Sequence, residues 1–400
     1  MNVVGIVAEY NPMHNGHIYN INKAKELTKA DFVIIIMSGS FTEQGNISVM
    51  DKFTKAEIAI QNGADMVIEL PTIFATSSAE NFAYGAINIL DKIGIITHLC
   101  FGAESDNIIE LQDIAKIKLN NKNEIIQSVK DKSKQGMSLS QAYAQTLIDF
   151  IDKDIESFTL PNNILGIEYL KALFALNSQI KPVLIQRKEV SHSDKEISNK
   201  SKYASSTSIR NVLSNISLSE DQKLEYIFSS VPQNTYDYLK NNTYNLNEKL
   251  WQPLKYEIIK LGVNGIKQIQ EVNEGLENNI YKQALVSNSY EQFIFNVKSK
   301  RYTLSKIKRI CVYILLGITK EKYTKLKDVA YARILKVKAK SSILLSKTST
   351  SSKIPVITKI TDDILKTLDE NVYESILLDI FANNIFNKPN MDFTNKIIQP

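Results

Sequence analysis

The sequence predicts an α/β protein: a Rossmann-like, doubly wound parallel sheet in residues 1–215, followed by an α-helical domain in residues 216–400. Three observations predict this arrangement. In the first part, short β-branched runs alternate with helical patterns, as in a parallel sheet covered on both faces. After about Asn215 the strand signal fades. The length of 400 residues also exceeds what one hydrophobic core usually supports, so two domains are expected.

The elements of the first domain follow from apolar runs and helix stop signals. Phe32–Met37 is a continuous apolar run, which is typical of a strand buried on both faces. A helical pattern ends at Gln61, just before the stop signal Asn62-Gly63. The predicted strands are Val3–Val7, Phe32–Met37, Met66–Leu70, His98–Phe101 and Pro182–Gln186, and the predicted helices include Ile18–Leu27, Ala56–Gln61 and Ala79–Leu90.

Helices dominate the second half. Ser219, followed by two acidic residues, predicts a helix start with a side-chain cap. One later helix face is predicted from apolar residues at helical spacing: Ile307, Ile310, Cys311, Ile314 and Leu315. We expect Lys306, Lys308 and Arg309 to point away from this face.

Composition indicates an ordinary globular protein, with 44% hydrophobic and 23% charged residues. The two cysteines, Cys100 and Cys311, are too few for a disulfide framework and form no Cys-x-x-Cys pair for zinc. The start lacks the features of a signal peptide, and no apolar stretch approaches the roughly 20 residues that span a bilayer. We therefore expect a cytoplasmic protein without a membrane segment.

The strongest chemical signal is Glu9–His17, which lies between the first strand and the first helix. Ligands bind at this carboxyl edge of doubly wound sheets, and a helix N-terminus suits phosphate. His14 and His17 are three residues apart, so both imidazoles can donate to phosphate oxygens from one side of the helix. Gly16 lacks a Cβ, which allows a planar base to approach the backbone. Nucleotide binding is the prediction; a zinc site, for which a third ligand is absent nearby, and incidental surface histidines are the alternatives.

This loop resembles the signature of the HIGH-type nucleotidyltransferase superfamily, whose members usually carry a second phosphate-binding element late in the α/β domain. The segment Ala204–Arg210 fits that role. The hydroxyls of Ser206 and Thr207 at a helix start, followed by Arg210, can hold the β- and γ-phosphates of ATP. On local sequence alone, the same segment is equally a capped helix.

Further motifs narrow the resemblance to the bacterial tRNA(Met) cytidine acetate ligase family. They are Met37–Phe41, Asn62–Pro71, Leu160–Gly166, Arg301–Thr303 and Asp328–Arg333, so the likeness covers most of the chain. Membership implies that ATP and acetate form acetyl-adenylate and pyrophosphate. The N4 amine of the wobble cytidine in elongator tRNA(Met) then attacks, giving N4-acetylcytidine and AMP. Mg²⁺ is expected to accompany ATP, and no metal site of the protein itself is expected. The roles of His192 and Asp194 stay open.

The resemblance also implies an ATP site, with His14, His17 and Arg210 as its catalytic residues. One asparagine of the pair Asn162-Asn163 is expected to contact ATP, and the sequence does not decide which. The expected ATP-binding residues are Val7, Ala8, Glu9, Tyr10, Asn11, Pro12, Met13, His14, Asn15, Gly16, His17, Ile18, Tyr19, Asn20, Gly102, Asn162 or Asn163, Arg187, Ser206 and Thr207.

The positive charge is concentrated in one segment of the second half. Residues 298–347 hold 15 Lys and Arg against two acids, a balance of +13 within a net charge of +5. A charge run is often only a solvated face, but tyrosines interleaved here favour RNA, since aromatic rings stack unpaired bases. We predict tRNA binding through Arg301, Lys306, Lys308 and Arg309.

Two other functions compete. A small-molecule adenylyltransferase that makes a dinucleotide cofactor would share the loop, but such enzymes are typically compact single domains. A non-catalytic RNA-binding protein with a relic nucleotide fold would not need intact His14, Gly16, His17 and Arg210.

Overall fold

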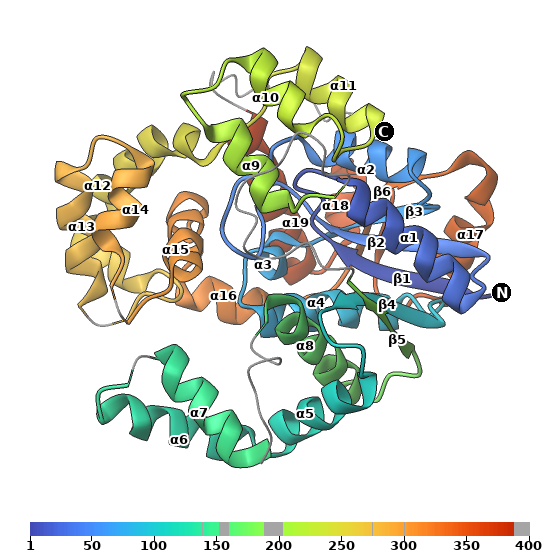
Figure 1. Cartoon of the computed structure of the whole chain (residues 1–400), viewed down its shortest axis with the longest axis horizontal. Coiled ribbons are helices and arrows are strands. Elements are labelled where there is room, and N and C mark those ends of the chain that lie inside the picture. Colours follow the sequence, from blue (N-terminus) through green and yellow to red (C-terminus); the bar gives the residue numbers. More distant parts are fainter. Residues whose placement is uncertain (138, 152–159, 188–202, 274, 300, 388–400) are drawn as a thin grey trace.

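A mostly parallel sheet lies at the centre of the protein. A computed structural model describes residues 1–137, 139–151, 160–187, 203–273, 275–299 and 301–387 (Figure 1). Seven strands of these ranges form one sheet in the order β5-β4-β1-β2-β3-β6-β7. The strands are β1 (Val3–Ala8), β2 (Phe32–Ser38), β3 (Met66–Leu70), β4 (His98–Ala103), β5 (Lys181–Gln186), β6 (Ala332–Val337) and β7 (Val356–Ile357). The five predicted strands are confirmed, and they pair in parallel from β5 to β3.

Helices cover both faces of the sheet, as the alternation in β2 requires. Ile34 and Ile36 pack into one apolar layer, and Val33 and Ile35 into the other. The first layer includes side chains of α3 (Thr72–Ala75), α4 (Ala79–Lys92), α5 (Ile108–Asn120) and α8 (Pro161–Ala175). The second includes α1 (Asn15–Thr28), α2 (Lys52–Gln61), α9 (Ser206–Ser214), α10 (Glu220–Ile227) and α11 (Gln233–Asn241). The doubly wound prediction is therefore confirmed.

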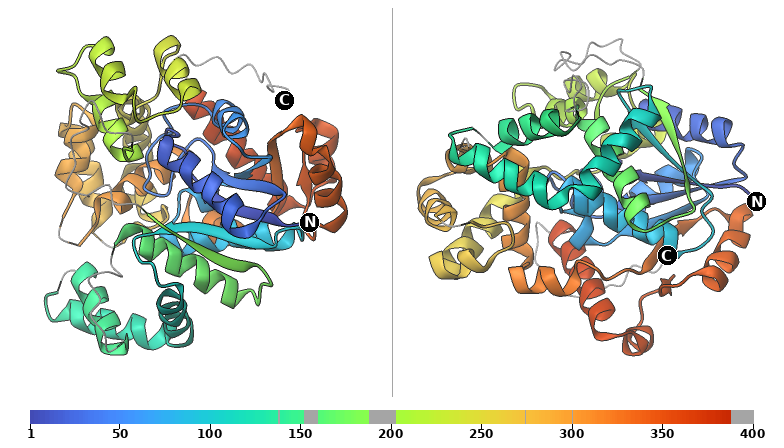
Figure 2. Two further views of the ribbon diagram at one scale, coloured as in Figure 1. Left: turned by 45° about the vertical axis from the view of Figure 1, so that its right-hand side comes forward. Right: turned by 90° about the horizontal axis from the view of Figure 1, so that it is seen from below.

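Six of the remaining helices in the described part of the chain form a cluster beside the sheet. The cluster contains η2 (Asn247–Leu250), α12 (Trp251–Gln268), α13 (Leu276–Val286), α14 (Tyr290–Val297), α15 (Leu304–Leu316) and α16 (Lys320–Leu326), and Figures 1 and 2 both show it beside the sheet. The other helices are α6 (Lys122–Lys134), α7 (Leu139–Ile151), η3 (Ala339–Ser341), α17 (Ser342–Ser351), α18 (Asp362–Thr367) and α19 (Glu370–Asn387). Among these described helices, none is both long and apolar enough to cross a bilayer.

The second half also contributes strands, which the sequence did not predict. β6 runs antiparallel to β3, with Glu69 opposite Arg333, and β7 pairs with β6. Two cations, the buried Lys52 and the half-buried Arg333, hold the Glu69 carboxylate, since Lys52 Nζ lies 2.6 Å and Arg333 Nη1 3.1 Å from its oxygens. The expectation that strands end near Asn215 is therefore wrong for residues 332–357. The helical region is confirmed, whereas the boundary at residue 215 stays a prediction.

Candidate active site

The loop between β1 and α1 is anchored at the carboxyl edge of the sheet. Asn11 is buried, and its side chain accepts a hydrogen bond from Val49 N at 2.7 Å and donates one to Ile47 O at 3.3 Å. This side chain therefore holds the loop in place.

The two histidines of the loop form one unit. Their rings stack with centroids 3.7 Å apart, and Gly16 N donates to His14 Nδ1 at 3.1 Å. His14 N in turn donates to His17 Nδ1 at 3.2 Å, so the pair caps α1. Because both Nδ1 atoms accept, each neutral ring carries its proton on Nε2. The helix start thus presents two aligned Nε2–H donors.

Burial and nearby positive charges keep both histidines neutral. Burial lowers the pKa of His14 to about 3, with the charges of Arg187 and Arg210 acting in the same direction. Burial, then His14 and Arg187, hold the pKa of His17 well below its ordinary value. At neutral pH, neither ring adds a positive charge, and both act as hydrogen-bond donors toward developing negative charge.

The start of α9 lies directly against this loop. Ser205 caps the helix, and Ser206 Oγ donates to Pro12 O at 3.1 Å. Arg210 Nη1 donates to the backbone carbonyl of Asn11 at 2.7 Å, and its Nη2 donates to Thr207 Oγ1 at 3.1 Å. The structure therefore brings a guanidinium and two hydroxyl residues, about 200 positions away in sequence, to the histidine pair.

A second polar group comes from the ends of β4 and β5. Arg187 Nη1 donates to Asn162 Oδ1 at 3.1 Å. A Cβ added at Gly102 would lie 3.4 Å from Arg187 Cγ and 3.7 Å from Asn20 Nδ2, so these residues are neighbours. Asn163 differs: it is fully buried, and its Oδ1 accepts from the backbone of residues 104 and 105 at 2.9 and 3.0 Å. Asn162 is the member of the pair that faces Arg187.

Sequence reasoning missed Lys55 on α2. Its ammonium is buried and donates to Ser38 O, Gly39 O and Glu9 O at 2.7, 2.9 and 3.1 Å. It therefore joins the carboxyl ends of β1 and β2, where the loop begins. Burial lowers the pKa of Lys55 to about 7. No local pattern marks it, because a lysine on an amphipathic helix is normally a surface residue.

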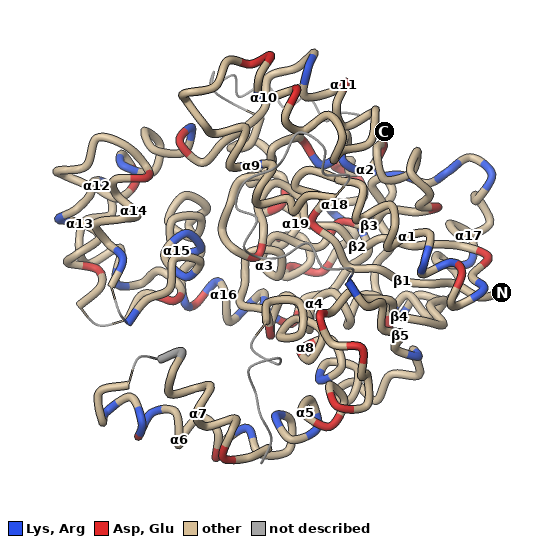
Figure 3. Tube along the Cα trace, viewed as in Figure 1, with Lys and Arg blue, Asp and Glu red and all other residues tan. Residues whose placement is uncertain are grey.

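The predicted basic stripe on α15 is only partly exposed. Lys306 and Lys308 are half-buried, with Lys306 Nζ 5.2 Å from the centre of the Tyr302 ring and Lys308 Nζ bonded to Asn46 Oδ1 at 2.9 Å. Figure 3 shows basic residues on α15, and Arg301 precedes that helix on the surface. The expectation that Arg309 points to solvent is wrong, because it is 8% exposed.

Burial of Arg309 has a specific cause. Its guanidinium donates three hydrogen bonds to the Glu271 carboxylate, at 3.0, 3.1 and 3.3 Å, and lies 3.7 Å from Glu43. A Cβ at Gly45 would lie 2.4 Å from Arg309 N, so the loop after β2 packs tightly on α15. Glu43 N in turn donates to Glu9 Oε1 at 2.7 Å. This arginine therefore connects α15 to the base of the active-site loop.

Comparison with known proteins identifies the family. The chain matches the model of the family HIGH Nucleotidyl Transferase over residues 1–398. It is 36% identical over 397 residues to a tRNA(Met) cytidine acetate ligase of Clostridium novyi, covering 97% of this chain and 96% of that protein. The chain belongs to this ligase family.

Solved structures support the same assignment. The crystal structure of Thermotoga maritima TmcAL bound with alpha-thio ATP is 31% identical and covers 96% of this chain and 94% of that chain, with a TM-score of 0.87. The apo structure of the same protein gives a TM-score of 0.89 at the same identity and coverage. The resemblance inferred from the motifs, and the nucleotidyltransferase fold with its helical region, are confirmed.

Two residues whose roles the sequence left open, His192 and Asp194, lie outside the described residues. Within the described ranges, no group of three or more His, Cys, Asp and Glu side chains is placed to hold a metal ion.

Proposed function

We propose that the chain is an ATP-dependent acetate ligase that acetylates N4 of the wobble cytidine of elongator tRNA(Met). In the first step, an acetate oxygen attacks the α-phosphorus of ATP, and pyrophosphate leaves. In the second, the cytidine N4 attacks the acyl carbon of acetyl-adenylate, AMP leaves, and the amine loses a proton. The product is N4-acetylcytidine.

One observation carries the proposal: the stacked His14 and His17 lie against the start of α9 in a chain 36% identical to a tRNA(Met) cytidine acetate ligase along 97% of its length. The two Nε2–H donors suit the oxygens around the α-phosphorus, where negative charge develops. Ser206, Thr207 and Arg210 suit the β- and γ-phosphates of the leaving group.

The other proposed ATP contacts are inferred from where their residues lie around the loop. The His14 ring fills the space beside Gly16, where a Cβ would lie 2.9 Å from His14 Cε1, so this glycine makes room for the stacked histidine and not, as the sequence predicted, for a base. Asn162, Arg187 and Gly102 form the second polar group and suit ribose and phosphate oxygens. Mg²⁺ arrives with ATP in this proposal, held by phosphate oxygens. The rest of the proposed site is the span Val7–Asn20, which contains the loop.

The tRNA surface is proposed to include Arg301, Lys306 and Lys308. The Lys306 ammonium lies over the Tyr302 ring, and both lysines are half-buried. Arg309 supports this surface from beneath through its ion pair with Glu271. Phosphate contacts from such side chains supply affinity without sequence specificity.

Acetate-dependent exchange of pyrophosphate into ATP, measured without tRNA, tests the first step. His17→Ala should lower this exchange by roughly 10²–10³-fold, because one preorganised donor to the transition state is removed. His98→Ala is the matched control, since that histidine begins β4 at the opposite edge of the sheet. Exchange at the wild-type rate in His17→Ala contradicts the assignment. Transfer of labelled acetate to tRNA tests the second step.

A further inference from the structure

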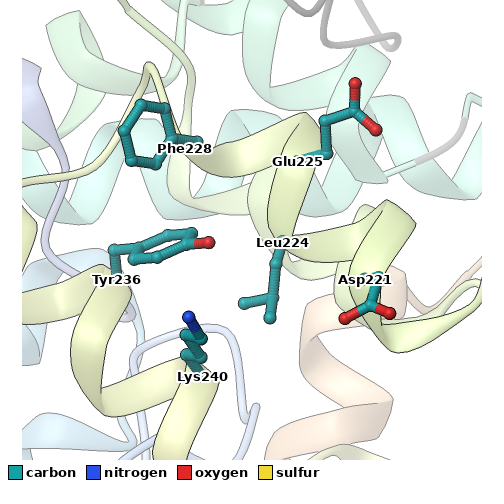
Figure 4. Close-up of a pocket in the computed structure, with 6 residues that line it drawn as sticks. All are labelled: Asp221, Leu224, Glu225, Phe228, Tyr236 and Lys240. Carbon is teal, nitrogen blue, oxygen red and sulfur yellow. The ribbon is translucent and has the colours of Figure 1, made fainter.

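A pocket between α10 and α11 lies outside the ATP site. It measures about 450 Å³ and is lined by Asp221, Leu224, Glu225, Phe228, Tyr236 and Lys240 (Figure 4). Phe228 is 56% exposed, and its ring meets the Tyr236 ring edge-on, with centroids 5.1 Å apart at 83°. An exposed phenylalanine packed on a second aromatic ring is a surface for stacking a flat ligand.

The wall of this pocket is fastened to the active-site loop. The two residues after Phe228 accept hydrogen bonds from Asn15: Ser229 O from its side-chain Nδ2 and Ser230 O from its backbone N, each at 2.9 Å. Asn15 stands between His14 and Gly16. The backbone that follows Phe228 is therefore tied directly to the segment that carries the proposed catalytic histidines.

The charges around the rings select a class of ligand. Asp221 and Glu225 supply carboxylate oxygens, and Lys240 supplies one ammonium group. Two acids against one base disfavour a phosphate, which would be repelled. They favour a planar group whose edge bears N–H donors, such as the exocyclic amine of adenine, cytosine or guanine.

We propose that this pocket stacks an unpaired base of the bound RNA on the exposed Phe228 ring, which Tyr236 supports edge-on, with the amino edge of the base toward the carboxylates that line the pocket. The inference rests on the proposed tRNA substrate, because an anticodon loop presents several splayed bases beside the one that reacts. The pocket holds a neighbour of the reactive cytidine and so fixes the position of the loop over the active site.

Kinetics of the full chain test the pocket. Phe228→Ala and Tyr236→Ala should each raise the KM for tRNA in acetyl transfer by about 5- to 100-fold, the range expected when one base stack is removed. The salt dependence of binding should stay unchanged, because no phosphate contact is removed. Tyr256→Ala, an aromatic residue 68% exposed on α12, is the matched control and should behave as wild type.

A spectroscopic variant reports the contact directly. Trp251 is the single tryptophan of the chain and is 2% exposed, so Phe228→Trp adds the one exposed indole. An anticodon stem–loop should quench this added fluorescence. The same stem–loop with an abasic site at the stacked position should not quench it. With this abasic RNA, Phe228→Ala and wild-type protein should also have the same KM.

The outcomes separate this inference from the proposed function. If wild-type protein acetylates tRNA but Phe228→Ala has an unchanged KM, the pocket does not hold a base, and a basic peptide partner becomes the explanation for its acids. If Phe228→Ala loses pyrophosphate exchange as well, the pocket belongs to the ATP site, and the inference is overturned. If wild-type protein neither binds nor acetylates tRNA, both proposals fail together.

Discussion

Gly16→Ala separates stability from catalysis in the loop. A Cβ at this position would lie 2.9 Å from His14 Cε1 and 3.0 Å from His14 Nδ1, closer than real contacts allow. The imidazole cannot swing aside freely, because it is 6% exposed and stacks on His17 at 3.7 Å. The ring must therefore move, and the bond from Gly16 N to His14 Nδ1, now 3.1 Å, lengthens.

The two effects on stability oppose each other. Removing one hydrogen bond costs about 1 kcal/mol, and replacing glycine by alanine in a helix gains up to about 1 kcal/mol. The free energy of unfolding, measured by urea denaturation, should therefore change by less than about 1 kcal/mol.

Catalysis should change far more. A displaced donor costs roughly 10²–10³ in rate, so acetate-dependent pyrophosphate exchange should fall by that factor. A variant that keeps wild-type exchange would falsify the proposed alignment of the histidines. A variant that loses several kcal/mol of stability would show that the loop, not the donor geometry, was disrupted.

Three further predictions concern titratable and charged side chains. The pKa of His14 is about 3 when folded and about 6.5 when unfolded, so the unfolded chain binds the extra proton as pH falls below 6.5. His14 should therefore lower the free energy of unfolding by about 2 kcal/mol when the pH falls from 6.5 to 5. In His14→Gln this loss should be absent when the free energy of unfolding is measured by urea denaturation at the two pH values. Lys306→Gln with Lys308→Gln should weaken tRNA binding and lower the salt slope of log K by about 0.7–0.9 for each phosphate that is no longer neutralised, while pyrophosphate exchange survives; an unchanged slope would assign these lysines to a solvated face. Arg309→Gln should instead destabilise the fold by about 3 kcal/mol, because Glu271 loses its buried partner; equal stability of variant and wild type in urea would contradict this role.

Sequence by itself determined the features that depend on neighbours along the chain. Five strands follow from apolar runs such as Phe32–Met37, and the cap at Ser219 follows from a hydroxyl before a helical pattern. The loop with His14 and His17 was recognisable because its residues lie within nine positions. Short-range patterns of this kind survive in almost any tertiary context.

Only the tertiary structure decided which distant groups share a desolvated site. Arg210 donates a hydrogen bond to the carbonyl of Asn11, 199 positions away. Glu69 pairs with Arg333, which lies in a strand whose sequence resembles that of the helices around it. In the sequence Arg309 resembles one more surface cation, and only the fold places Glu271 beside it. Burying a charge is favourable only when an opposite charge or several acceptors are buried with it, and that pairing is set by how the chain returns to the sheet. The sequence shows which residues are charged, but not how the chain folds back onto the sheet. These hydrogen bonds and ion pairs could therefore not be predicted from it.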